Sequence, residues 1–211
     1  TTISEGTLSL TGPGNISSSS IITNNANFDI SAANSNVAIN TLTGSGITNL
    51  GSQNLNLVNA SGTYNGVISG TGGITITSGS LSVGGINTFS GATVIGSSAS
   101  LMMVANGSMS KSSISNSGIL DITGSSSSAT IAGLSGNGQT VLGNKTLSLA
   151  NASGAYTGSI IGSKGNLNIA GGTQVLNPNP TNVYDGSISL SGGVLQISNA
   201  NALGTTLLAM N

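Results

Sequence analysis

Few side chains in this sequence could take part in acid–base or metal chemistry. The charged residues are Glu5, Asp29, Asp121, Asp185, Lys111, Lys145 and Lys164, and the chain contains no His, Cys or Arg. Without His, the commonest general base and the Ser-His-Asp triad are excluded. Without Cys, thiolate nucleophiles and zinc–thiolate sites are excluded as well. Catalysis would have to rest on the carboxylates.

The spacing of the acids does not suit a carboxylate pair. Asp29 and Asp121 are 92 residues apart, which on a 20-residue solenoid is four to five coils, on the order of 20 Å. A glycosidase pair needs about 5–9.5 Å. Three scattered lysines do not supply a polysaccharide lyase site, and the GG steps are not followed by the Asp of calcium-binding repeats. We expect no enzyme activity, no catalytic residue, no cofactor and no metal.

The composition limits the kinds of partner that the chain could bind. Only 3% of the residues are charged and the net charge is −1, so we expect no contact with nucleic acid and no polybasic membrane contact. There is no apolar run of 18 residues, and the sequence opens in polar, turn-rich residues instead of a signal peptide, so we expect a cytosolic chain or, in preference, part of a larger protein. The hydrophobic fraction of 36%, mostly aliphatic, is enough for a long thin core.

Alternating apolar residues recur between Gly, Ser and Asn turns. This pattern predicts short strands of about three to five residues with one buried face. The pairs are Leu8/Leu10, Phe28/Ile30, Val37/Ile39, Leu55/Leu57, Ile74/Ile76, Leu81/Val83, Leu101/Met103, Leu120/Ile122, Leu147/Leu149, Leu167/Ile169, Ile188/Leu190 and Leu195/Ile197.

The pairs return about every 20 residues, as from Leu81 to Leu101 and from Leu147 to Leu167. Such a period is typical of a solenoid. We predict a parallel β-helix of about ten coils, stacked about 4.8 Å apart, with at least two strands in each coil. An antiparallel sandwich also uses short alternating strands and is the alternative.

A longer block is repeated as well. We predict one β-helix over residues 1–211 with an internal duplication of about 42–101 and 134–197. In it Leu50, Leu55, Leu57, Asn59, Gly62, Tyr64, Gly66 and Gly70 correspond to Leu142, Leu147, Leu149, Asn151, Gly154, Tyr156, Gly158 and Gly162. The aromatic residues could be carbohydrate-stacking platforms. Since Tyr64, Tyr156 and Tyr184 occupy repeat or motif positions, we prefer a stacking ladder or a corner seal.

Both blocks end in a recognisable motif. It reads Asn87-Thr88-Phe89-Ser90-Gly91, followed by Thr93, Ile95 and Leu101; the second copy reads Asn182-Val183-Tyr184-Asp185-Gly186, then Ser189, Leu190, Gly193, Leu195 and Ile197. These segments, with Ser198–Thr205, resemble the autotransporter-associated β-strand repeat of Gram-negative type V secreted passenger domains. Val183, Asp185 and an extra residue before Leu101 depart from the family pattern.

The resemblance implies a right-handed β-helix at the cell surface or secreted, with an outer-membrane translocator barrel in the full-length chain. It implies an adhesive stalk that acts in cell–cell aggregation, biofilm formation or attachment to a host receptor, matrix or glycan, with self-association between β-helices. The adhesive face is unknown. The alternatives are a segment of an oligomeric secreted toxin, a polysaccharide-acting solenoid, or an ice-binding solenoid. Only Thr75-Ile76-Thr77 and Thr41-Leu42-Thr43 have the Thr-x-Thr form that ice binding favours.

Overall fold

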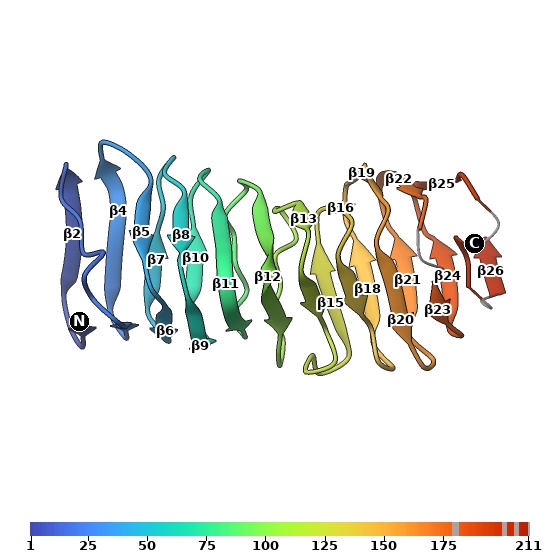
Figure 1. Ribbon diagram of the computed structural model, residues 1–211, viewed down its shortest axis with the longest axis horizontal. Helices are drawn as coiled ribbons and strands as arrows, with labels where there is room; N and C mark the ends of the chain where they lie inside the picture. Colours follow the sequence, from blue (N-terminus) through green and yellow to red (C-terminus); the bar gives the residue numbers. More distant parts are fainter. Residues whose placement is uncertain (179–181, 200–201, 205–206, 211) are drawn as a thin grey trace.

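The chain winds into a parallel β-solenoid of about ten coils with about 20 residues in each (Figure 1). The computed structural model describes residues 1–178, 182–199, 202–204 and 207–210. Within these ranges there is no helix, and the strand pairings are parallel. The predicted β-helix is therefore confirmed, and the alternative of an antiparallel sandwich is wrong.

Three sheets run along the solenoid, so a regular coil contributes three strands, which agrees with the prediction of at least two. The first sheet contains β1 (Thr2–Ile3), β3 (Ile22–Asn24), β6 (Leu42–Gly44), β9 (Ala60–Tyr64), the second halves of β11 (Ile74–Val83) and β12 (Thr93–Met103), β14 (Ile119–Asp121), β17 (Gln139–Val141), β20 (Ser159–Gly162) and β23 (Val183–Tyr184). The second sheet contains β2 (Thr7–Gly12), β4 (Asn27–Ala33), β7 (Ile47–Asn49), β10 (Val67–Ser69), β15 (Ser128–Ile131), β18 (Thr146–Leu149), β21 (Asn166–Ile169), β24 (Ser187–Leu190) and β26 (Leu207–Met210). The third sheet contains β5 (Val37–Ile39), β8 (Leu55–Leu57), the first halves of β11 and β12, β13 (Ile114–Asn116), β16 (Leu134–Gly136), β19 (Ala152–Tyr156), β22 (Gly172–Leu176) and β25 (Val194–Ile197).

The predicted stacking of apolar pairs matches the register. Leu81 pairs with Leu101, and Leu101 pairs with Leu120. Leu147 pairs with Leu167 one coil further on. Because each pair sits above the next, the aliphatic side chains form continuous rows along the axis.

The middle of the rod is less regular than the ends. Strands β11 and β12 have 10 and 11 residues, longer than predicted, because they stay extended around a corner and pair with each other on both sides of it. They join the first and third sheets into one of 17 strands. Between β10 and β15 the second sheet has no named strand. It continues there through backbone hydrogen bonds, such as the one that Thr88 donates to Ile68, and through the isolated bridges of Ile86 with Ser108 and Met109 with Ile131.

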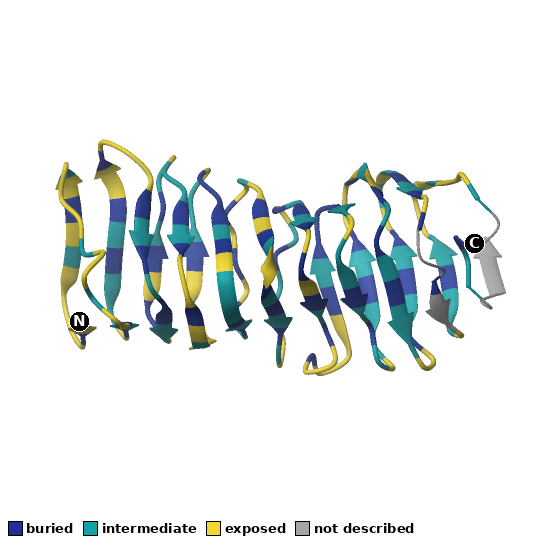
Figure 2. Ribbon diagram, viewed as in Figure 1, coloured by how far each residue is buried: buried dark blue, intermediate teal, exposed yellow. Residues whose placement is uncertain are grey.

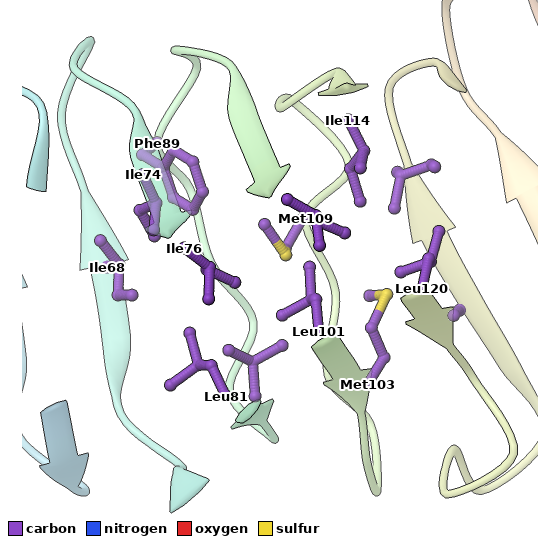
Figure 3. Packing of buried hydrophobic residues seen from close by; sticks show 14 of the residues in the cluster. Ile68, Ile74, Ile76, Leu81, Phe89, Leu101, Met103, Met109, Ile114 and Leu120 are labelled. Carbon is purple, nitrogen blue, oxygen red and sulfur yellow. The ribbon is translucent and has the colours of Figure 1, made fainter. Parts of the chain in front are cut away.

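The core is one long cluster inside the coils. Buried and more exposed positions alternate along the strands. The buried positions of neighbouring strands such as β15, β18 and β21 lie side by side (Figure 2). Figure 3 shows the middle of this core, where Phe89, Ile74, Leu101 and Met109 from successive segments point into the same interior. Aliphatic side chains thus make up most of the core, together with four fully buried aromatic residues, Phe28, Tyr64, Phe89 and Tyr156.

One predicted inward pair is wrong in part. Leu195 only packs partly against the core, and Ile197 is 44% exposed. Both lie on β25, whose one strand pairing in the described part of the chain is with β22. A strand with a neighbour on one side only leaves its side chains less covered than those within the stack.

The two related blocks lie on different sheets. At a spacing of 92 residues, β6 would correspond to β16, yet β6 belongs to the first sheet and β16 to the third. Four steps along the first sheet lead from β6 through β9, β11 and β12 to β14, and two further strands lead to β16. The spacing is therefore about four and two-thirds coils, which turns the second block by one face.

Candidate functional surface

Two of the acidic residues, Asp29 and Asp121, each accept a hydrogen bond from the backbone N–H two residues further along the chain. The Asp29 carboxylate accepts bonds from the backbone N–H of Ser31 at 2.9 Å and the side-chain amide of Asn49 at 3.2 Å. Hydrogen bonds from Ser31, above all from its side chain, lower the pKa of Asp29. Asp121 accepts the N–H of Thr123 at 2.8 Å in the same way. No group of three or more potential metal ligands occurs among the described residues.

The most connected polar cluster surrounds Tyr64, which is fully buried. Its hydroxyl donates to the carbonyl of Gly46 at 2.7 Å, and lies 2.9 Å from the Thr48 hydroxyl. The side-chain amide of Asn24 donates to the same phenol oxygen at 3.1 Å. Gly66 leaves room for this contact, because a Cβ there would lie 1.9 Å from the Gly46 carbonyl oxygen. The ring closes a corner, and cannot stack on a sugar.

The same cluster occurs again 92 residues further on. The hydroxyl of Tyr156 donates to Gly138 O at 2.7 Å, lies 2.9 Å from Thr140 Oγ1, and is 3.4 Å from the amide nitrogen of Asn116. Burial raises the pKa of Tyr156 to about 12 and raises that of Tyr64 as well, although the hydrogen bonds act in the opposite direction. Tyr64 and Tyr156 are therefore corner seals. The side chain of Tyr184 lies outside the described part of the chain.

The asparagine of the recurring motif also serves a corner. The Asn87 side-chain oxygen accepts the N–H of Ile68 at 2.9 Å, and the Asn182 oxygen accepts the N–H of Ile160 at 2.7 Å. Both asparagines are buried. Each one satisfies a backbone donor of the preceding coil that would otherwise be unpaired. The motif residues thus hold neighbouring coils together.

Gln174 is an exception in the interior. It is fully buried, and its amide nitrogen donates to the carbonyl of Leu134, two coils away, at 2.9 Å and to that of Gly154 at 3.2 Å. Its Oε1 is a buried acceptor without a partner. Gln174 stands over Gly154 in the register, as Leu81 stands over Gly62 in the first block. A leucine, as at the equivalent position 81, therefore fits this buried interior better than a glutamine does.

The outer surface carries rows of hydroxyl and amide groups. On the second sheet the side chain of Asn168 donates to Ser148 Oγ at 3.2 Å and accepts from Ser189 Oγ at 3.0 Å. A parallel row joins Ser187 to Asn166 at 2.9 Å. These rows bond along the rod and still lie within reach of solvent, so they form a regular polar skin with few charges.

The Thr-x-Thr segments do not make a flat threonine face. Thr41 is buried and its hydroxyl accepts the N–H of Ser61 at 2.9 Å. Thr75 lies between Asn56 and Val94 in the register, so no threonine adjoins it on either side. The arrangement that ice binding favours is thus not formed at either segment.

Sequence reasoning missed several residues of these clusters. Asn24, Thr48, Asn116 and Thr140 look like ordinary members of a polar-rich chain. The signal that could have found them is that Asn24 and Asn116, like Thr48 and Thr140, are the same residue type 92 positions apart. The similarity between the two blocks therefore begins before residue 42, the predicted start of the duplication.

Comparison with protein-family models, curated proteins and solved structures found no match to this chain. Within the described residues, no segment forms a helix of the length and apolarity needed to cross a membrane.

Proposed function

We propose that this chain is part of an extracellular adhesive stalk, the β-helical passenger of a Gram-negative type V secreted protein. In this role it contributes to cell–cell aggregation or to attachment to a surface. The β-solenoid fold itself is compatible with several functions. The resemblance of the motifs around Asn87 and Asn182 to autotransporter repeats supports the secretion route.

The observation that carries the proposal is the regular polar skin. Rows such as Ser148–Asn168–Ser189 present hydroxyl and amide groups at one coil spacing, with little net charge on the whole chain. A single hydrogen bond contributes about 0.5–1.5 kcal/mol net, so many of them along a rod would give useful adhesion. Low net charge removes long-range repulsion between the rod and another surface.

The test is an adhesion assay with beads that carry the purified chain. We expect coated beads to clump, or to attach to cultured host cells or matrix, more than beads coated with serum albumin. An antibody against the chain should also label intact cells of the source bacterium. Coated beads that stay dispersed and unattached, together with labelling only after permeabilisation, would rule out the proposal.

A further inference from the structure

An exposed aliphatic ladder lies on the second sheet near the N-terminal end. Ile47 is 54% exposed, Val67 36% and Ile86 63%. Ile47 pairs with Val67 in register. The preceding glycines stack in the same order, because a Cβ on Gly85 would lie 1.8 Å from the Gly66 carbonyl oxygen. The three side chains therefore project side by side from successive coils.

The fold does not need aliphatic residues at the first two of these positions. At the spacing of 92 residues, Ile47 and Val67 correspond to Gln139 and Ser159, which lie in register on β17 and β20. The buried residues next to them are the same in both blocks, as with Thr48 and Thr140. Since the same backbone forms with polar side chains outside, the ladder has a reason other than folding.

The surroundings of the ladder are polar and define its ends. Asn27 precedes Ile47 in the same row, and Ser108 follows Ile86. Asp29 lies beside Asn27 at one end, and Lys111 is an exposed residue just beyond Ser108 at the other. The ladder is thus apolar, with an acidic residue near one end and, in the turn that follows Ser108, a basic residue near the other.

We propose that this face pairs with the same face of a second copy of the chain, with the two rods antiparallel and Val67 at the two-fold axis. The pairing deepens the proposed function, on which its biological role rests. In this arrangement Ile47 of each copy lies against Ile86 of the other. The same rotation brings Asp29 of each copy towards Lys111 of the other, twice in the complex.

A second copy suits the ladder better than another partner does. Successive side chains of the ladder are one coil apart, about 4.8 Å. Another rod of the same kind presents a surface with this same period. The opposite charges at the two ends match only in the antiparallel orientation. Three side chains cover far less than the roughly 800 Å² per partner of a stable interface. Each pairing is therefore weak and reversible, and many rods on one surface would act together.

The first test is sedimentation equilibrium of the purified chain over a concentration series. We expect a monomer–dimer equilibrium for the unchanged chain. The triple variant Ile47→Gln, Val67→Ser, Ile86→Thr should lower the association constant of the dimer about tenfold or more. The reason is that the variant buries less apolar surface on association. The matched control is Ile119→Asn, which removes an exposed aliphatic residue from the first sheet.

The second test fixes the orientation and uses the absence of cysteine in the chain. With a short bis-maleimide, Val67→Cys should cross-link to itself. Ile47→Cys should cross-link in a mixture with Ile86→Cys and far less when alone. Lys111→Glu, which would face Asp29, should weaken association a few-fold in low salt and much less in high salt.

The outcomes separate this inference from the proposed function. Equal association of the triple variant and the unchanged chain, or a strictly monomeric chain at about 1 mM, would overturn the pairing. Loss of bead attachment to host cells in the triple variant, without cross-linking at Val67, would also overturn it and assign the ladder to a foreign partner. Cross-linking as expected on beads that neither clump nor attach would leave the pairing intact and remove the adhesive role.

Discussion

Removing the hydroxyl of Tyr156 tests whether the corner seal stabilises the fold. Tyr156→Phe keeps the ring and deletes the oxygen that contacts Gly138, Thr140 and Asn116. The carbonyl of Gly138 keeps a second donor, the N–H of Ser159 at 3.1 Å. The amide of Asn116 likewise keeps the carbonyl of Gln139 at 2.9 Å. The group left unpaired is the fully buried hydroxyl of Thr140.

These contacts set the expected loss in the free energy of unfolding. The lost bond to the carbonyl contributes about 1 kcal/mol net, and an orphaned buried hydroxyl costs about 1–3 kcal/mol, so the variant should lose about 2–4 kcal/mol. Adding Thr140→Val removes the orphaned group while keeping the shape. The double variant should therefore regain about 1–2 kcal/mol relative to Tyr156→Phe alone.

The assay is urea unfolding followed by far-ultraviolet circular dichroism, with linear extrapolation to water. Thr63→Val, a change at an exposed threonine, is the control and should stay within about 0.5 kcal/mol of the unchanged chain. A loss of less than about 0.5 kcal/mol in Tyr156→Phe would refute the reasoning. So would a further loss of stability on adding Thr140→Val.

Three other predictions use the same unfolding measurement. Burial raises the folded-state pKa of Tyr156 from 10.0 to about 12 and also raises that of Tyr64, so the stability present below pH 10.0 should fall as the pH rises above it. Tyr156 alone should account for about 1.4 kcal/mol per pH unit between 10.0 and 12, and a flat profile would contradict this. Gln174→Leu should raise stability by about 1 kcal/mol, because it removes an unpaired buried acceptor, and a loss would show that its amide bonds outweigh that cost. Replacing residues 134–162 with a copy of 42–70 should change stability by no more than about 1 kcal/mol, since the buried side chains are the same, and failure to fold would contradict the equivalence of the faces.

The rows of the core could be predicted from the sequence because one physical rule governs them. Each strand is short and needs one buried face, so Leu147, Leu167 and their equivalents return once per coil. The third strand of each coil was harder to predict from the sequence. Strands such as β7 carry Thr48 inward between two residues that face outward, and a single buried threonine gives no apolar alternation.

The polar clusters could be predicted only in outline. Tyr64 and Tyr156 stood out as rare aromatic residues at repeat positions, which favoured a seal over a sugar platform. Their partners Asn24 and Asn116 lie 40 residues away from them, two coils back. Contacts across two coils depend on how the glycine corners bring the carbonyls together, and that geometry has no local pattern.

The placement of the two blocks explains how the inside and the outside of the rod could diverge. The 92-residue spacing of the two blocks is not a whole number of coils, yet the strands of both blocks have parallel neighbours, because all three sheets need the same pattern of buried residues. The residues that satisfy it, such as Leu42 and Leu134, are kept although they lie on different sheets. An outward residue has no such requirement, and the second block presents it in a new direction. A ladder such as Ile47 with Val67 can then exist on one side only, while the corresponding residues of the second block, Gln139 and Ser159, are polar.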